Sequence, residues 1–266
     1  MTRLAAIALV ALAAASSSGA AQAPPTIVPG TLTVALSLPS PGFQAGAVRP
    51  NGSVVAARGL EIDLARSLAA RLGIRRVRFR NEPSFPRLLA RGQKPWDVAL
   101  AEVTITSARR GSVDFSSSYL RADTGVLMAK DLPAPKSLAE LAGLRLCYQA
   151  GTTTAGLVAN RIRPRLAPYR FTSVDVLFER LRTKRCQAVL LDAPVLAAER
   201  AEAPYRYGPL AGVIVTGEQW GVVLPKGSQL TRRVTTAINR LVANGTVARL
   251  QRRWLSTDVT KLPILD

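Results

Sequence analysis

The stretch from Trp96 to Tyr119 changes character twice and constrains this chain more than any other segment. It begins with an apolar run, Val98–Ala101, which is typical of a buried strand. A polar turn with an N-cap hydroxyl, Thr106 or Ser107, then predicts the start of a helix that carries Arg109. Free N–H groups at a helix start attract anions, and an arginine fork can hold a carboxylate through two parallel hydrogen bonds. The sequence therefore predicts an anion site here, with a plain surface position of Arg109 as the alternative.

The residue order of this stretch, T-I-T-x-x-R followed by V-D-F-S and a tyrosine, resembles the signature of bacterial periplasmic solute-binding proteins of the polar amino-acid type, family 3. The resemblance implies that Thr104 and Arg109 hold the α-carboxylate of an amino acid. Glu102 stands where many members of that family have glycine, so the ligand stays open. Glu102 either favours a ligand with an extra positive group or an amide, or pairs with one of the arginines.

Residues 1–23 have the pattern of a secretory signal. Arg3 provides a positive start, Leu4–Ala15 an apolar stretch, and Ala21-Gln22-Ala23 a small-x-small cleavage site. The apolar stretch is short for a bilayer span, and the segment has no cysteine that could accept a lipid. We therefore expect an exported, soluble protein of the periplasm without a lipid anchor.

The chain has 36 basic and 17 acidic residues, a net charge of +19. Because the arginines are spread along the chain without a long basic run, compositional bias is the first explanation, attraction of anions the second and nucleic-acid binding the last. The chain contains no histidine, which excludes Ser-His-Asp and Cys-His catalysis and histidine-containing zinc sites. We expect no metal, no cofactor and no nucleic-acid partner.

Cys147 and Cys186 are the two cysteines of the chain. An even pair in an exported protein favours a disulfide, and two buried thiols are the alternative. Both cysteines belong to the second half of the chain, so we expect the bond to lie within one lobe. Their places in two strands, one late and one at the start, require the Cα atoms to approach within roughly 7 Å.

Strand-like and helical segments alternate in the first half of the chain, as in α/β proteins with mainly parallel sheets. The clearest helix is Gly59–Gly73, in which leucines recur at every fourth position. The positive dipole end of that helix explains Glu61 and Asp63, so neither is assigned a ligand role. Phe43 follows the first strand, Thr31–Leu36, and is either a core residue or, as the resemblance implies, an aromatic that packs on the ligand.

Two further candidates lie in the second half. The loop Gly151–Thr154 opens a helix, and its hydroxyls and free N–H groups suit an anion, although capping alone would use one threonine. The resemblance aligns the family's second ligand loop with Thr152 and Thr153. Asp192 follows the strand Cys186–Leu191 at the end where open α/β sheets bind ligands, and it can also cap the next helix. Position and resemblance together predict that Asp192 binds the α-ammonium group.

The expected fold is α/β, with two lobes, two hinge crossings and a ligand cleft between the lobes, the type II periplasmic binding protein fold. The first lobe would comprise residues 24–120 and 217–266, and the second residues 121–216, with crossings near 119–125 and 216–221. Thr104 and Arg109 would form one wall of the cleft, and Thr152, Thr153 and Asp192 the other. A ligand that bridges both walls favours the closed state.

The function that the resemblance implies is the substrate-binding component of an ABC importer. Such a protein is a monomer and not an enzyme, and it hands a polar amino acid or a similar small solute to an inner-membrane permease. Two alternatives remain open. Periplasmic enzymes such as dehydratases of prephenate-like acids use the same fold, and Glu102 is the candidate acid. A sensory binding protein without a transporter is the other alternative.

Overall fold

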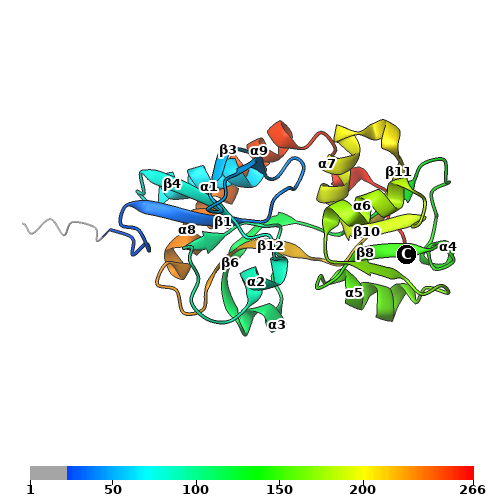
Figure 1. The fold of residues 1–266 in the computed structure, drawn as a ribbon, viewed down its shortest axis with the longest axis horizontal. Coiled ribbons are helices and arrows are strands. Elements are labelled where there is room, and N and C mark those ends of the chain that lie inside the picture. Colours follow the sequence, from blue (N-terminus) through cyan, green and yellow to red (C-terminus); the bar gives the residue numbers. More distant parts are fainter. Residues whose placement is uncertain (1–22) are drawn as a thin grey trace, which may run out of the picture.

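The chain folds into two α/β lobes that lie side by side (Figure 1). The structure, a computed structural model, describes residues 23–266, so the predicted secretory signal lies almost wholly outside the described residues. Each lobe is built on one five-stranded mixed sheet with helices packed against it. This arrangement confirms the predicted fold class of two α/β lobes.

The sheet of the first lobe has the strand order β4-β1-β5-β12-β6. Strand β1 runs parallel to β4 and β5, whereas β12 is antiparallel to β5 and β6. All residues of β1 are buried, as expected for a strand with neighbours on both sides. The strands are β1 Thr31–Leu36, β4 Arg76–Asn81, β5 Val98–Ala99, β6 Val113–Arg121 and β12 Gln219–Pro225, with a separate hairpin of β2 Ala45–Val48 and β3 Val54–Arg58. The helices are α1 Leu60–Arg71, α2 Phe85–Leu89, α3 Ser107–Arg110, α8 Thr231–Ala243 and α9 Thr246–Trp254.

The second lobe repeats this plan with the strand order β11-β7-β10-β8-β9. Strand β8 is parallel to β9 and β10, and β7 is antiparallel to β10 and β11. The strands are β7 Thr124–Ala129, β8 Leu146–Gln149, β9 Tyr169–Phe171, β10 Ala188–Asp192 and β11 Tyr207–Ile214. The helices are α4 Leu138–Leu141, α5 Thr154–Leu157, α6 Val174–Arg182 and α7 Ala193–Glu202, with a π-helical turn at Val158–Ile162 and 3-10 turns at Pro204–Arg206 and Val259–Lys261.

Two crossings of the chain connect β6 to β7 and β11 to β12. A carboxylate oxygen of Asp123, in the first crossing, accepts the backbone N–H groups of Thr216 and Gly217, in the second, at 2.9 Å each. A carboxylate that accepts backbone N–H groups forms strong, charge-assisted hydrogen bonds. Asp123 therefore joins the two crossings into one hinge.

The C-terminal segment makes a third crossing, which differs from the expectation that 217–266 belongs wholly to the first lobe. After α9 the chain returns to the second lobe and pairs with the edge strand β11. The N–H of Val213 donates to the carbonyl of Pro263, and the N–H of Leu265 donates to the carbonyl of Val213, at 2.8 Å each. Leu265 is 2% exposed and packs in the core of this lobe. A Cβ on Gly212 would lie 2.5 Å from the Pro263 carbonyl oxygen, so glycine is what permits this approach. The edge position of β11 leaves backbone groups free to accept the segment.

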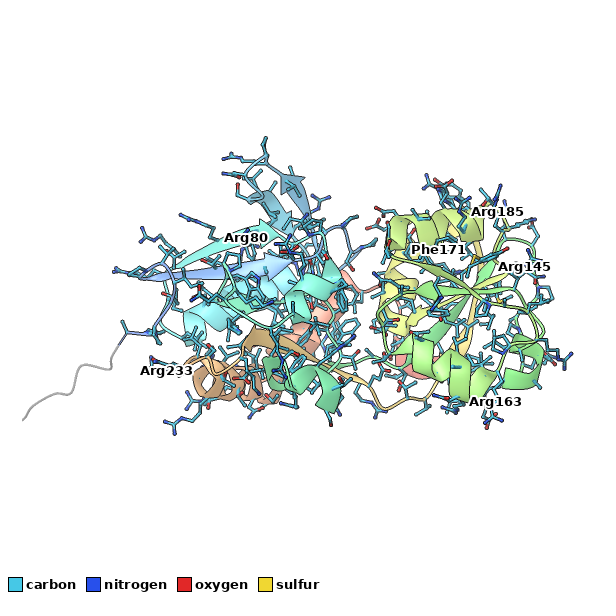
Figure 2. The ribbon with its side chains drawn as sticks, turned by 60° about the horizontal axis from the view of Figure 1, so that its bottom comes forward. Arg80, Arg145, Arg163, Phe171, Arg185 and Arg233 are labelled. Carbon is cyan, nitrogen blue, oxygen red and sulfur yellow. A yellow bond between two sulfur atoms is a disulfide. The ribbon has the colours of Figure 1, made fainter. Side chains whose placement is uncertain are left out.

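The arginine side chains point mainly into solvent. Figure 2 labels Arg145, Arg163 and Arg185 on the second lobe, where all three are exposed and lie far from the first lobe. Most ion pairs in residues 23–266 involve such exposed basic groups, and pairs of this kind contribute little to stability.

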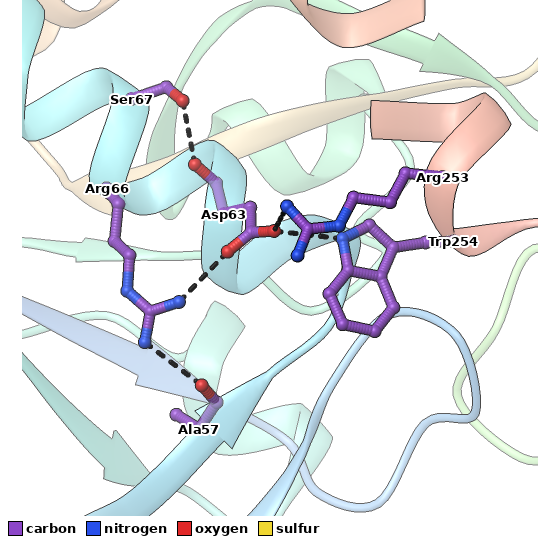
Figure 3. Close-up of polar contacts among 6 residues, drawn as sticks. All are labelled: Ala57, Asp63, Arg66, Ser67, Arg253 and Trp254. Atoms are coloured by element: carbon purple, nitrogen blue, oxygen red, sulfur yellow. Dashed lines mark hydrogen bonds and ion pairs between the residues drawn. The ribbon is translucent and has the colours of Figure 1, made fainter. Parts of the chain in front are cut away.

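Asp63, in the first turn of α1, joins this helix to α9 (Figure 3). Its carboxylate accepts the indole N–H of Trp254 at 3.0 Å and forms ion pairs with Arg66 at 2.9 Å and Arg253 at 3.4 Å. Asp63 is therefore a tertiary link, which goes beyond the dipole role that the sequence predicted. It holds the last helix of the first lobe before the chain turns to the second.

Cys147 and Cys186 form a disulfide, as predicted. Cys147 lies in β8, and Cys186 lies just before β10, the neighbouring parallel strand. Their Cα atoms are 5.8 Å apart, within the range that a disulfide requires. The bond therefore lies entirely within the second lobe.

Candidate functional site

A cleft lies between the two lobes, and both lobes line it. Its walls are the segments that follow the carboxyl ends of the parallel strands β1 and β5 in one lobe and β8 and β10 in the other. Open α/β sheets bind their ligands at such strand ends. The cleft brings together six of the seven predicted ligand-binding residues: Glu102, Thr104, Arg109, Thr152, Thr153 and Asp192.

Phe43 is the seventh, and it does not line the cleft. Its side chain is 0% exposed and packs edge-on against the Trp220 ring, with 5.3 Å between the ring centroids. Phe43 is therefore a core residue, which is one of the two positions that the sequence left open for it. The aromatic that lines the cleft is Phe85, at the start of α2, and the guanidinium of Arg109 lies 5.5 Å from the centre of its ring.

Arg109 is held at the base of the first wall by local structure. The hydroxyl of Thr106 caps α3 by accepting the N–H of Arg109 at 3.1 Å. The guanidinium donates to the carbonyl of Thr104 at 2.8 Å and, across the cleft, to the carbonyl of Gly151 at 3.4 Å. Burial lowers the pKa of Arg109, whereas Glu218 and Asp192 raise it again. The cleft thus contains a fixed positive charge that faces both lobes.

Glu218 joins the two walls. One oxygen of its carboxylate accepts the hydroxyl of Thr104 at 2.9 Å and the hydroxyl of Thr153 at 2.8 Å. Thr104 belongs to the first wall and Thr153 to the second, while Glu218 lies in the crossing between β11 and β12. The hydroxyl of Thr152 instead donates to the carbonyl of Gln149 at 2.7 Å. The two threonine hydroxyls that face the cleft therefore already bind a carboxylate.

Asp192 ends β10 and faces the cleft from the second wall. Its carboxylate accepts the indole N–H of Trp220 at 2.9 Å and makes no capping bond to α7, so the structure does not show the capping alternative. Burial, together with the nearby charge of Glu218, raises the pKa of Asp192 to about 8. A carboxyl group in such surroundings gains strongly from a cationic partner.

Glu102, in the first wall, and Glu61, directly behind it, form a pair of neighbouring carboxyl groups. The backbone N–H of Glu102 donates to Glu61 at 3.0 Å, and the side-chain amide of Gln44 donates to both carboxylates. Glu61 is 0% exposed and also accepts the hydroxyl of Tyr119. Burial raises the pKa of both glutamates, and the repulsion between them raises that of Glu102 further.

Glu102 has a backbone φ of 50°, in the left-handed region that favours glycine. A glutamate held in this conformation is consistent with the glycine that the resembled family often has here. The ion pairs in residues 23–266 include none to Glu102, which decides against its pairing with an arginine.

Three residues near the cleft were not predicted to belong to the site: Glu61, Glu218 and Trp220. Glu61 had a signal, because it stands three, four and seven residues before Leu64, Ala65 and Leu68, on the buried face of α1. Glu218 and Trp220 had none, since each contacts a cleft residue, Thr104 or Asp192, only through the path of the second crossing. Within residues 23–266, no group of histidine, cysteine, aspartate and glutamate side chains is arranged to hold a metal ion. None of the helices of this part of the chain combines the length and apolar character that a bilayer span requires.

A family model described as bacterial extracellular solute-binding proteins, family 3, matches residues 32–257. Among relatives of known name, the ABC transporter glutamine-binding protein GlnH of Bacillus subtilis is 24% identical over 204 residues, 75% of this chain and 73% of its own length. The L-cystine-binding protein TcyJ of Escherichia coli is 25% identical over 205 residues, 76% of each chain.

Solved structures resemble this fold closely. An ancestral arginine-binding protein bound to glutamine superposes with a TM-score of 0.73 at 28% identity, covering 86% of this chain and all of its own. An ancestral amino acid-binding protein described as a precursor of cyclohexadienyl dehydratase gives a TM-score of 0.69 at 27% identity, with coverage of 85% and 96%.

Proposed function

Because this chain belongs to family 3 of the bacterial extracellular solute-binding proteins, we propose that it captures a polar amino acid in the periplasm and delivers it to an ABC permease of the inner membrane. The family consists of amino-acid-binding components of ABC importers. The observation that carries the proposal is the meeting of an arginine, two threonine hydroxyls and an aspartate across one cleft. The protein acts as a monomer in this account, since both walls come from one chain.

The α-carboxylate of the ligand binds to Arg109 and the hydroxyls of Thr104 and Thr153. Glu218 supports this assignment, because its carboxylate already accepts both hydroxyls. A hydroxyl group donates one proton, so a ligand carboxylate that takes these bonds displaces Glu218. Arg109 adds charge-assisted bonds that offset the loss of water from the entering carboxylate.

The α-ammonium group binds to Asp192 on the opposite wall. The raised pKa of Asp192 supports this role. Burial destabilises the charged carboxylate, and an ammonium ion beside it stabilises that charge. A zwitterion then touches both lobes at once, through its carboxylate and its ammonium group. Each lobe alone satisfies only part of the ligand, so binding favours the closed state by differential contacts.

A test begins with native mass spectrometry of the protein as purified, followed by calorimetric titration with a panel of amino acids. The proposal expects a ligand of amino-acid mass that leaves on denaturation, and saturable one-to-one binding of at least one amino acid. The absence of binding across the whole panel would contradict the proposal.

A second candidate function is acid-catalysed elimination from a small carboxylic acid. The observation that favours it is the pKa of Glu102, which burial and Glu61 raise well above the ordinary value, as a general acid requires. Incubation of each bound compound followed by chromatography separates the two functions. Recovery of unchanged ligand supports capture, whereas conversion that is lost in Glu102→Gln supports the enzyme.

A further inference from the structure

Four of the 17 acidic residues lie together at the cleft. Glu61, Glu102, Asp192 and Glu218 all lie in or directly behind the cleft walls, where Arg109 is the basic side chain among the lining residues. The whole chain has 36 basic and 17 acidic residues, so an acidic cleft runs against its overall composition. None of the ion pairs in residues 23–266 involves these four carboxyl groups.

Among the described residues, the side chains around Glu102 hold its carboxyl group in place and include no cation to pair with it. Its N–H is bound to Glu61, and its side chain accepts from the amide of Gln44 at 3.1 Å. The partners of Glu61 are already in place, since it accepts from Gln44, from Tyr119 and from the Glu102 backbone. The titratable groups that face Glu102 are therefore Glu61 of α1, with Tyr119 of β6 behind it, and Asp192 of β10. All of them are acidic.

Ser40 provides a second polar group in the same part of the cleft. It lies in the loop after β1, lines the cleft and is only 5% exposed. Its hydroxyl lies beside the carboxyl group of Glu102, and a hydrogen bond between the two lowers the pKa of that group. A serine hydroxyl that donates its one proton to a carboxylate keeps lone pairs that can accept an N–H, so a ligand cation at Glu102 can bind both groups.

Charge balance then separates classes of ligand. A neutral zwitterion places its carboxylate at Arg109 and its ammonium at Asp192, which leaves Glu102 without a positive partner. Glu102 can stay uncharged by keeping a proton, or it can ionise against a second cation. When Glu102 ionises beside a cation, its buried negative charge is paired, which removes the cost of an isolated buried charge.

We propose that the ligand is a cationic amino acid, whose side-chain amine or guanidinium binds to Glu102 with the Ser40 hydroxyl beside it. This inference rests on the proposed function, because it assumes the amino-acid site described above. Glu61 acts as a positioning residue, since it holds the backbone of Glu102 and does not touch the ligand. Binding of the cation releases the proton of Glu102 to solvent.

The test is a set of calorimetric titrations with L-arginine, L-lysine and L-glutamine. We expect L-arginine or L-lysine to bind at least roughly 30-fold more tightly than L-glutamine, as for a buried charge pair. Titration in two buffers of different ionisation enthalpy should show about one more proton released with the cationic ligand than with L-glutamine, because both ligands displace the proton of Asp192 and only the cationic ligand displaces that of Glu102. Glu102→Gln should remove most of this preference, whereas Glu179→Gln, on the exposed face of α6, should leave it unchanged.

Two results would overturn the inference: L-glutamine that binds the parent as tightly as L-arginine, or a Glu102→Gln variant that weakens all three ligands equally. If L-glutamine binds and Arg109→Ala abolishes that binding, the proposed function stands and this inference fails. If no amino acid of the wider panel binds, both fail together. A Glu102→Gln variant that no longer folds would show a lost melting transition, and Ser40→Ala then provides the same comparison without removing a charge.

Discussion

At the scale of single residues, the backbone of Glu102 is the strongest sign that its side chain matters. A non-glycine residue in the left-handed region costs about 1 kcal/mol relative to glycine. We predict that Glu102→Gly is about 1 kcal/mol more stable than Glu102→Ala, since both lack the carboxyl group and differ only in the Cβ atom. Urea unfolding of the ligand-free proteins measures the difference.

The matched control is the same pair at Glu179, in the interior of α6. Glycine weakens a helix there, so Glu179→Gly should be about 1 kcal/mol less stable than Glu179→Ala, the opposite sign. Equal stability of the two Glu102 variants would mean that this backbone carries no strain.

Asp192 gives a prediction about pH. An acid with a higher pKa in the folded than in the unfolded state binds more protons when folded, so the free energy of unfolding falls as pH rises between the two values. For Asp192 this window runs from about 4 to about 8. The melting temperature of the ligand-free protein should therefore fall across this window, and it should fall less in Asp192→Asn.

Other buried acids, such as Glu61 and Glu102, have pKa values raised in the same direction, so Asp192→Asn should reduce the slope without abolishing it. Asp175→Asn, at an exposed position of α6, serves as the control and should follow the parent. An identical slope in Asp192→Asn and the parent would contradict the role of burial at this site.

The sequence and the family resemblance predicted which residues reach the cleft where the contacts are local, and the ligand-binding roles of those residues stay predictions. Thr104 and Arg109 lie within one strand-to-helix turn, and Asp192 ends a strand, so the local positions together with the family resemblance predicted that each lies at the cleft. Glu218 could not be predicted in this way, because its contacts to Thr104 and Thr153 span 114 and 65 residues of sequence. Phe43 was ambiguous for a similar reason, since only the position of Trp220 decides that it packs in the core.

At the scale of secondary-structure elements, the disulfide fastens the second lobe. It joins β8 to the segment before β10 and closes a loop with a sequence separation of 39. A loop of this length contributes about 4 kcal/mol in the chain-entropy model. We predict that the Cys147→Ala/Cys186→Ala double variant loses stability on this order in urea unfolding under non-reducing conditions.

Addition of dithiothreitol should weaken the parent to a similar extent and leave the double variant unchanged. Thiol labelling of the denatured, unreduced parent should find no reactive cysteine. Two labelled thiols per chain would contradict the bond.

The ends of one predicted helix match the structure better than those of one predicted strand, for a physical reason. The predicted helix at 59–73 matches α1, Leu60–Arg71, because its leucine spacing is set by the helix itself. The predicted strand Val98–Ala101 contains only Val98–Ala99 as β5, since the length of a strand depends on partners elsewhere in the sheet. After Ala99 the chain turns toward the cleft and brings Glu102 to its wall.

At the scale of the whole molecule, Glu218 holds the two lobes together through Thr104 and Thr153. Hydrogen bonds to a charged group contribute on the order of 2 kcal/mol each. We predict that Glu218→Ala opens the ligand-free protein, which small-angle X-ray scattering would detect as a larger radius of gyration. Glu202→Ala, at an exposed position at the end of α7, is the control, and an unchanged radius in Glu218→Ala would argue against this link.

The third crossing was beyond prediction from the sequence. Residues 262–266 form a short segment with a proline, and such a segment has no periodicity of its own. Its place is set by the free edge of β11 and by the space beside Gly212. The two lobes and their alternating elements were predictable because each core is built from local α/β units. The C-terminal segment instead runs from the first lobe to a strand edge of the second.

We propose above that Arg109 binds the carboxylate of an amino acid in a cleft formed by both lobes. The most direct measurement is calorimetric titration of the parent, Arg109→Ala and Arg109→Lys with the tightest ligand of the panel, each with a melting curve. We predict that Arg109→Ala loses on the order of 2–5 kcal/mol of binding free energy and keeps a similar melting temperature. Arg109→Lys should recover only part of it, because a point charge cannot replace the fork. The neighbouring exposed Arg110→Ala should bind like the parent, and an Arg109→Ala variant that binds as tightly as the parent would contradict the claim.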